Sequence, residues 1–411
     1  MSVNSHRLDW SRRVVTIVAC ALVGTCPVLA SASPLSRAKT QEGYALAYDL
    51  RFQASYEVLA EAEAADPTDP APPRAIAAVT WMEALFAQGV ATFEAFDGEV
   101  SKSDVKRPVV SPVIADRFHR SIARATMLAR RQSARSEDAD AYYQVGATAA
   151  LQAVYGATVE GRTFGSLRHG RAAVSAMRRA RELNPRTRET ALVLGMSQYT
   201  VATMSWPVRA LARLSGLSGD RETALALLTE AAMPGTETES DALLLLTIID
   251  SRERRPADAL PRLQRLQQRH PRNRLFWLNE GAAAVLAGHP ERADVALSRG
   301  IAVQAWTVAP AILGEPGLWF AHRGTARARL DRITEAERDL ASGLVSDPRD
   351  WVRGRIHAQL GRIAVATGDM ERARREFLAA IEFSQRGGDG ETSKEAKDSL
   401  DSTTRRVVGG L

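Results

Sequence analysis

A spacing of small, large and proline residues recurs along the C-terminal half of the chain and limits how it can fold. Gly324 is followed after twelve residues by Ala336, and then by Leu340, Gly343 and Pro348 at steps of four, three and five. A period of this kind is typical of proteins built from repeated structural units. Neighbouring segments keep the spacing with some residues replaced: Gly281, Ala293, Leu297 and Gly300; Gly361, Ala373, Phe377, Ala380 and then Gln385; Thr247, Ala259, Leu263, Leu266 and Pro271.

The spacing suits two antiparallel helices joined by a turn. Small residues at the glycine and alanine positions let the helices approach closely, and the large apolar residue four positions later fills the space beside that contact. The proline ends the second helix, because it has no amide hydrogen and disfavours helix in the preceding residue. An aromatic residue four positions before the glycine, such as Trp277 before Gly281, lies on the same helical face. His357 takes this place before Gly361 and is expected to pack like an aromatic residue.

These residues resemble the tetratricopeptide repeat, a helix pair with small, large and proline positions at this spacing. The resemblance covers roughly residues 240–386. It implies an all-α fold, a right-handed α-solenoid of antiparallel helix pairs in which each pair is stabilised by its neighbours. Composition agrees with a helical chain, because aromatic residues, which favour strands, make up only 6% of it.

The N-terminal half shows the second helix of the unit without a glycine at the usual distance. Gly146 and Gly195 lie 27 and 29 residues before Ala173 and Ala224, instead of twelve. We therefore expect each of these units to be longer by about four helical turns. The matching positions are Ala173, Met177, Ala180 and Pro185 in one unit and Ala224, Leu228 and Ala231 in the next.

One stretch of the N-terminal half is similar to a narrower group of repeat proteins. It runs from Gly195-Met196-Ser197-Gln198-Tyr199 through Trp206-Pro207 to Leu217-Ser218-Gly219-Asp220-Arg221-Glu222-Thr223-Ala224-Leu225. It resembles a bacterial envelope branch related to the eukaryotic inclusion-body-clearance family of tetratricopeptide proteins, which implies a scaffold rather than a reaction. Within it, Asp220 is expected to cap a helix. Trp206, Leu211 and Leu214 are expected to pack onto neighbouring helices rather than lie on a membrane.

The first residues are typical of a secretion signal. Arg12 and Arg13 precede an apolar run over residues 14–29, and Ala30-Ser31-Ala32 offers a cleavage site. We expect cleavage and export to the periplasm, with an uncleaved membrane anchor or lipidation at Cys20 as alternatives. The chain has 2 cysteines, both within this segment, so the mature protein would carry no thiol.

The sequence therefore suggests five parts. A signal peptide precedes an irregular helical region, and a short tail with a capping helix from about residue 392 to 406 follows the repeats. Their ranges are 1–32 for the signal peptide, 33–135 for the irregular region, 136–240 for elongated helix pairs, 241–386 for the regular array and 387–411 for the tail.

No catalytic, cofactor-binding or metal site is predicted. The 7 histidines include no HExxH pattern and no pair at i, i+4, and neither GxSxG nor, after the signal, SxxK occurs. A basic stripe with interleaved aromatics, typical of nucleic-acid binding, is also missing. An envelope enzyme is the alternative, with a site between residues 86 and 220. Its candidate residues are Tyr142, Tyr143, Tyr155, Arg162 and His169.

The resemblance also implies a binding surface. In such arrays the first helix of each pair lines a concave groove, so we expect a non-enzymatic scaffold that binds a protein partner of the cell envelope there. A shallow apolar groove with arginines at its border would suit an amphipathic or acidic segment. A purely structural spacer without a groove is a third hypothesis. The predicted positions are Leu278, Ala282, Val285, Ala321, Thr325, Ala328, Arg329, Arg355, Ala358 and Arg362.

Overall fold

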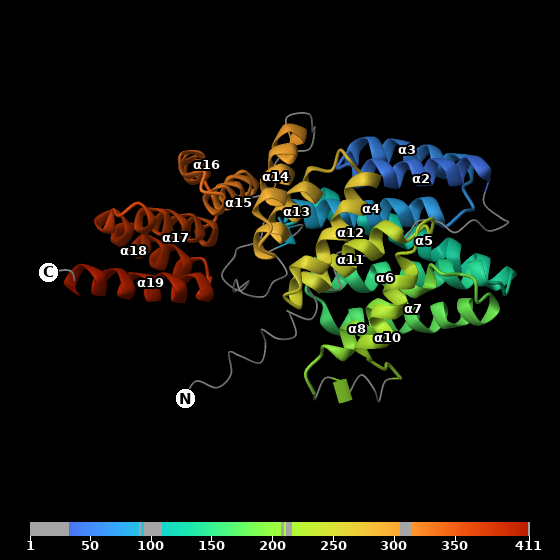
Figure 1. The fold of residues 1–411 in the computed structure, drawn as a ribbon. Coiled ribbons are helices and arrows are strands. Elements are labelled where there is room, and N and C mark those ends of the chain that lie inside the picture. The colour runs from blue at the N-terminus through green and yellow to red at the C-terminus, as the bar shows by residue number, and fades with distance from the viewer. Residues whose placement is uncertain are drawn as a thin grey trace. The chain divides into compact units, whose positions relative to one another are not determined.

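The computed structural model describes residues 33–89, 92–93, 109–206, 209–210, 216–304, 312 and 314–409. The predicted signal peptide, with Cys20, lies outside the described residues. The part of the chain that is described forms 17 α-helices and no β-strand (Figure 1), which confirms the all-α fold class. None of these helices is both long and apolar enough to cross a membrane.

The chain divides into two compact units. Unit 1 comprises residues 1–87, 109–249 and 268–271, and unit 2 comprises residues 88–108, 250–267 and 272–411. The division runs through helices α11 (Glu239–Arg252) and α12 (Pro256–Arg269). The predicted start of the regular array at residue 241 thus falls inside α11.

Unit 1 consists of helices that pack in consecutive pairs, α2 with α3, α4 with α5, α6 with α7 and α8 with α10. Asp220 caps α10 as predicted, because its carboxylate accepts from the Thr223 amide at 2.7 Å. The helices are α2 (Pro34–Tyr48), α3 (Phe52–Ala65), α4 (Ala71–Ala87), α5 (Pro112–Arg135), α6 (Ala139–Thr158), α7 (Thr163–Leu183), α8 (Thr190–Ala202) and α10 (Arg221–Ala231).

Two expectations for unit 1 need correction. The α6–α7 pair is long, with 20 and 21 residues, but α8 and α10 have only 13 and 11. The additional residues of the α8–α10 pair lie between its two helices, after Ala202 and before Arg221, rather than within them. The packing predicted for Trp206 is also wrong, since its side chain is 74% exposed, whereas Leu211 and Leu214 lie outside the described residues.

Unit 2 continues the pairing, α13 with α14, α15 with α16 and α17 with α18. The predicted capping helix is present as α19, which packs on α18 and ends the array (red in Figure 1). His357 of α17 stacks on the Phe383 ring at 5.4 Å between centroids, as expected of an aromatic substitute. The helices are α13 (Arg274–Leu286), α14 (Pro290–Gln304), α15 (Glu315–Arg329), α16 (Ile333–Val345), α17 (Asp350–Ala366), α18 (Met370–Arg386) and α19 (Gly390–Gly409).

The repeat glycines permit the close helix approach that their spacing predicted. Each faces the large apolar residue sixteen positions later, in the second helix of its own pair. A side chain at the glycine would force its neighbours to shift, because real Cβ atoms essentially never approach other atoms within 3.0 Å. The distances from a Cβ to the nearest atom of that residue would be 2.3 Å for Gly281 and Leu297, 2.7 Å for Gly324 and Leu340, and 2.6 Å for Gly361 and Phe377.

A buried ion pair joins two consecutive helix pairs of unit 2. The Arg274 guanidinium of α13 donates to the two carboxylate oxygens of Glu315 at 2.6 and 3.0 Å. The two side chains are 1% and 0% exposed. Glu315 also accepts from the amide of Ile312 at 2.9 Å and from the indole of Trp319 at 3.2 Å. A buried charge without such partners would strongly destabilise the fold, so these contacts hold the start of α15 on α13.

Candidate functional site

A groove of about 490 Å³ lies within unit 2, on the face formed by the first helices of its pairs. We call it the unit 2 groove. α13, α15 and α17 supply most of its wall, and the start of α19 supplies the rest. The lining residues are Val285, Leu286, Leu318, Ala321, His322, Thr325, Arg329, Trp351, Val352, Arg355, Ala358, Gln359, Arg362, Glu391, Thr392 and Glu395.

The structure brings most of the predicted binding positions together on this wall. These are Val285, Ala321, Thr325, Arg329, Arg355, Ala358 and Arg362. Ala328 of α15 is half-buried and is not part of the lining.

Leu278 and Ala282 do not belong to the groove, because both are fully buried. The reason is that α13 is covered on nearly all sides until its last turn, where Val285 and Leu286 reach the groove. A helix that is apolar around its whole circumference is expected in a core. The sequence from Leu275 to Leu286 carried this signal in part, because only Asn279 and Glu280 interrupt its small and apolar residues.

The arginine on the second turn of α17 is already neutralised by the chain itself. Arg355 donates through Nε to Asp389 at 2.7 Å, and its guanidinium lies 4.8 Å from the centre of the Trp351 ring. The Asp389 side chain is fully buried. It also accepts from the Thr392 amide at 3.0 Å, and so caps α19.

A second pair, nearer the solvent, repeats this arrangement. Arg362 donates to Glu395 of α19 at 2.6 Å, with side chains that are 45% and 54% exposed. Two of the three arginines predicted to border the groove are therefore anchors for α19. Sequence reasoning missed their carboxylates, since the pairs join residues 33 and 34 positions apart. The cap at Asp389, directly before α19, was the only local signal.

The third arginine, Arg329 at the end of α15, has a different environment. Its guanidinium donates to the backbone carbonyl of Val285, and no carboxylate of the described residues pairs with it. Burial, together with the positive charge of Arg362, lowers the pKa of Arg329. The groove thus contains a cation whose charge the described part of the chain leaves uncompensated. An anion placed beside Arg329 would find a hydrogen-bond donor and a favourable potential.

The residues of the enzyme alternative are only partly brought together. Tyr143 and Tyr155 are buried at opposite ends of α6, about 18 Å apart along its axis by the usual helical rise. Tyr155 stacks on Phe118 at 3.5 Å, and Arg162 pairs with Glu160. Tyr155 and Arg162 are therefore neighbours at one end of α6, where His119 contacts both the Tyr155 ring and Glu160, whereas Tyr143 lies at the other end. Among the residues that the structure describes, no group of acidic, histidine or cysteine side chains is suited to hold a metal ion.

One serine and one histidine outside that region do contact each other. Ser240 Oγ lies 2.8 Å from His270 Nε2, and the residues are 6% and 8% exposed. The His270 ring stacks on Tyr48, and burial, followed by the charge of Arg269, lowers the pKa of His270 to about 4. The pair is enclosed in the core of unit 1, where its hydrogen bond satisfies two buried polar groups.

Comparison with known proteins gives only structural likenesses. No protein-family model matches the chain, and no curated protein sequence matches it. The human IFIT1 dimer with PPP-AAAA is similar over 99% of this chain and 87% of its own, with 13% identity and a TM-score of 0.39. Yeast Tom70 is similar over 90% and 83%, with 11% identity and a TM-score of 0.34. The APC/C hetero-tetramer Cut9-Hcn1 is similar over 91% and 84%, with 10% identity and a TM-score of 0.37.

These three matches have TM-scores below 0.5, so the resemblance to tetratricopeptide repeats rests on the spacing of the residues. The narrower resemblance to a bacterial envelope branch stays a prediction.

Proposed function

We propose that this protein is a non-enzymatic scaffold that binds an acidic segment of a protein partner in the unit 2 groove. The observation that carries the proposal is Arg329, a cation that no carboxylate of the described residues neutralises, on the wall of a 490 Å³ groove. A carboxylate from a partner would complete it with a charge-assisted hydrogen bond, which is about twice as strong as a neutral one.

The rest of the groove suits a polypeptide rather than a small ion. Its wall combines apolar side chains, among them Val285, Leu318 and Val352, with the polar Thr325. Neighbouring helices lie about 8–10 Å apart, so three of them span roughly 20 Å. An extended segment of about six residues has this length at about 3.3 Å per residue. We therefore expect an acidic residue flanked by apolar ones.

The pairs made by α19 decide which arginine to test. Substituting Arg355 or Arg362 would release the capping helix as well as alter the groove, because both hold carboxylates of that segment. Arg329 can be changed without removing an ion pair of the described residues. Arg374, on the exposed face of α18 and outside the groove lining, is the matched control.

The first experiment locates the contact in cells. A photo-crosslinking amino acid replaces Thr325, whose hydroxyl bonds only within its own helix, to Ala321 O at 2.8 Å. The same amino acid at Arg374 controls for collisions. We expect Thr325 to capture a partner and the crosslinked peptide to contain Asp or Glu. Equal capture from both positions, or none from Thr325, would refute the groove.

The second experiment measures how much the charge of Arg329 contributes to the binding affinity. A synthetic copy of the crosslinked segment is titrated against the wild type, R329Q and R374Q by fluorescence anisotropy. We expect R329Q to weaken binding about tenfold, since an interaction of about 1.4 kcal/mol corresponds to that factor. R374Q should bind like the wild type. Equal weakening by both variants would mean that only net charge matters, and the specific role of Arg329 would be wrong.

We also infer that the protein works after export, because residues 1–32 combine two arginines, an apolar run and a small-residue cleavage site. N-terminal sequencing of the protein recovered from fractionated cells tests this inference. We expect a periplasmic chain that starts near Ser33. A membrane-bound chain that C20S releases would indicate the lipoprotein, and an intact N-terminus in the cytoplasm would contradict export.

A further inference from the structure

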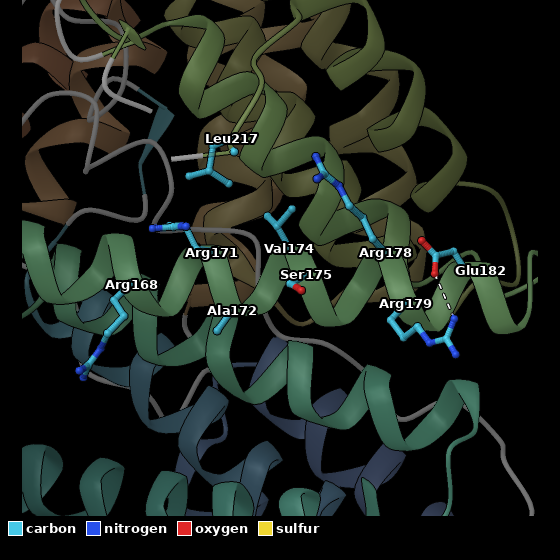
Figure 2. Close-up of a pocket in the computed structure, with 10 residues that line it drawn as sticks. Arg168, Arg171, Ala172, Val174, Ser175, Arg178, Arg179, Glu182 and Leu217 are labelled. Atoms are coloured by element: carbon cyan, nitrogen blue, oxygen red, sulfur yellow. Dashed lines mark hydrogen bonds and ion pairs between the residues drawn. The ribbon is translucent and has the colours of Figure 1, made fainter. Parts of the chain in front are cut away.

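A second feature, in unit 1, is a cavity of about 590 Å³ along helix α7 that arginines dominate. Arg168, Arg171, Arg178 and Arg179 line it, together with Val174. Figure 2 shows Arg171, Val174 and Arg178 projecting from α7 on the side where Leu217 lies. Their spacing of three and four residues places them along one face of the helix.

Most of this positive charge is uncompensated. Arg179 pairs with Glu182 at 3.3 Å, the dashed contact in Figure 2, and with Glu137 at 2.9 Å. No carboxylate of the described residues lies within ion-pair distance of the other three arginines. The pKa of His169, on the same helix, is lowered by burial and then by the charges of Arg168 and Arg130. The effect of these two arginines is a second indication of positive potential along α7.

A smaller cavity of about 140 Å³ adjoins this one, and it is apolar. Helices α6, α7 and α8 line it with side chains such as Val154, Leu167 and Met196. Val174 and Leu217 belong to the walls of both cavities. Apolar cavities of about 150 Å³ accept groups the size of benzene. The smaller cavity therefore has room for an apolar group of about six carbons.

Gly170 is a reason that this space exists. It lies inside α7 and lines the apolar cavity, and a Cβ placed on it would meet nothing within 4 Å. Its backbone is helical, so the glycine is not required by its conformation. Glycine within a helix costs stability relative to residues with side chains. Gly170 therefore keeps the apolar cavity open, although it makes α7 less stable.

We propose that unit 1 binds an anionic amphiphile, an alkyl or acyl chain that ends in a carboxylate or phosphate. The apolar end occupies the cavity beside Gly170, and the anion meets Arg171 and Arg178 across Val174. Ligand sites commonly join an apolar pocket to a few placed polar groups, and arginine is the side chain best shaped to bind carboxylate and phosphate. This site is separate from the groove of unit 2 and does not depend on the function proposed for it.

The test compares four probes by isothermal titration calorimetry with the purified mature chain. Octanoate carries both parts of the proposed ligand, octan-1-ol lacks the charge, octylammonium reverses it, and inorganic phosphate lacks the chain. We expect octanoate to bind at least tenfold more tightly than any of the others. Equal binding of octanol would reduce the site to a hydrophobic cavity, and equal binding of phosphate would reduce it to an anion site. Either result would overturn the proposal.

Two variants locate the binding. G170L should abolish octanoate binding by filling the apolar cavity, while its melting temperature stays equal or rises, because leucine favours a helix more than glycine does. R171Q/R178Q should weaken octanoate at least tenfold. R186Q/R188Q removes the same charge from exposed positions beyond α7 and should leave binding unchanged. Octanoate that binds G170L as it binds the wild type would show that it occupies another surface, and the site would be wrong.

Discussion

The buried pair Arg274–Glu315 allows a quantitative test of how one repeat is held on the next. Both side chains are almost completely buried, and the contact is bidentate, at 2.6 and 3.0 Å. R274M removes the cation but leaves an aliphatic side chain of similar length in place. Because the Glu315 carboxylate then stays buried without its partner, we expect a loss of about 3–5 kcal/mol in the free energy of unfolding.

A second substitution separates charge from packing. E315Q in the R274M background removes the stranded charge. Ile312 N and Trp319 Nε1 contact different carboxylate oxygens of Glu315, at 2.9 and 3.2 Å, and the single amide oxygen of the glutamine can still accept from one of them. We expect the double variant to recover at least about 2 kcal/mol relative to R274M, since replacing both members of a buried pair costs far less than removing one.

Urea unfolding followed by circular dichroism gives these free energies, and native-state hydrogen exchange shows where the protein opens. In a repeat array the loss of protection from exchange should be largest in α13 and α15 and smaller in the flanking helix pairs. The reasoning fails if R274M loses less than about 1 kcal/mol, or if E315Q brings no recovery in the R274M background. Either result would mean that water reaches the Glu315 carboxylate, or that packing rather than the ion pair joins the helix pairs of α13 and α15.

Two further predictions concern stability and pH. Burial, followed by the charge of Glu189, raises the pKa of Glu237 from 4.5 to about 8, so the native state holds this proton more strongly than the unfolded chain. Stability should therefore fall as the pH rises from about 4.5 to 8. The fall is at most about 5 kcal/mol, at about 1.4 kcal/mol per pKa unit, and nearer to about 2 kcal/mol because water reaches part of the side chain. E237Q should remove that fall in urea titrations at several pH values, and parallel curves for the two proteins would refute the assignment. G281A should lose about 1–2 kcal/mol against the rigid Leu297 contact at 2.3 Å, measured by urea unfolding. G146A is its control, because there the nearest atoms belong to the flexible Met177 at 3.0 Å, and a loss equal to that of G281A would contradict the steric argument.

The fold could be predicted where one local rule repeats. Glycine, alanine and a large residue at fixed spacing describe a contact between two helices of the same pair, and the contact of Gly324 with Leu340 follows from it. The length of each helix is less determined by such spacing. Gly195 and Ala224 are 29 residues apart, and nothing local decided whether the surplus would lengthen α8 and α10 or lie between them.

The groove could be predicted in outline for the same reason. Its wall consists of first helices, so positions such as Thr325 and Arg362 follow from the repeat register. What the register does not contain is the partner of each side chain. Leu278 fits the register yet lies in the core, because the burial of α13 depends on elements packed around it. The pairing of Arg355 with Asp389 depends on where α19 returns to the array.

The arginines of this chain show most clearly what only three-dimensional structure can decide. Arg274 and Arg355 each hold a fully buried carboxylate, and their charge is used within the fold. Arg329 and Arg171 line cavities, and no carboxylate of the described residues pairs with them. All four lie on helices, so neither composition nor helical spacing distinguishes the paired arginines from the unpaired ones. A charge that the fold has already neutralised stabilises it, whereas one left open on a concave wall is free to bind a ligand. That difference is the physical basis for proposing a polypeptide groove in unit 2 and an amphiphile site in unit 1. The R329Q and R171Q/R178Q variants should accordingly change binding while leaving the free energy of unfolding within about 0.5 kcal/mol, as substitutions outside buried networks usually do.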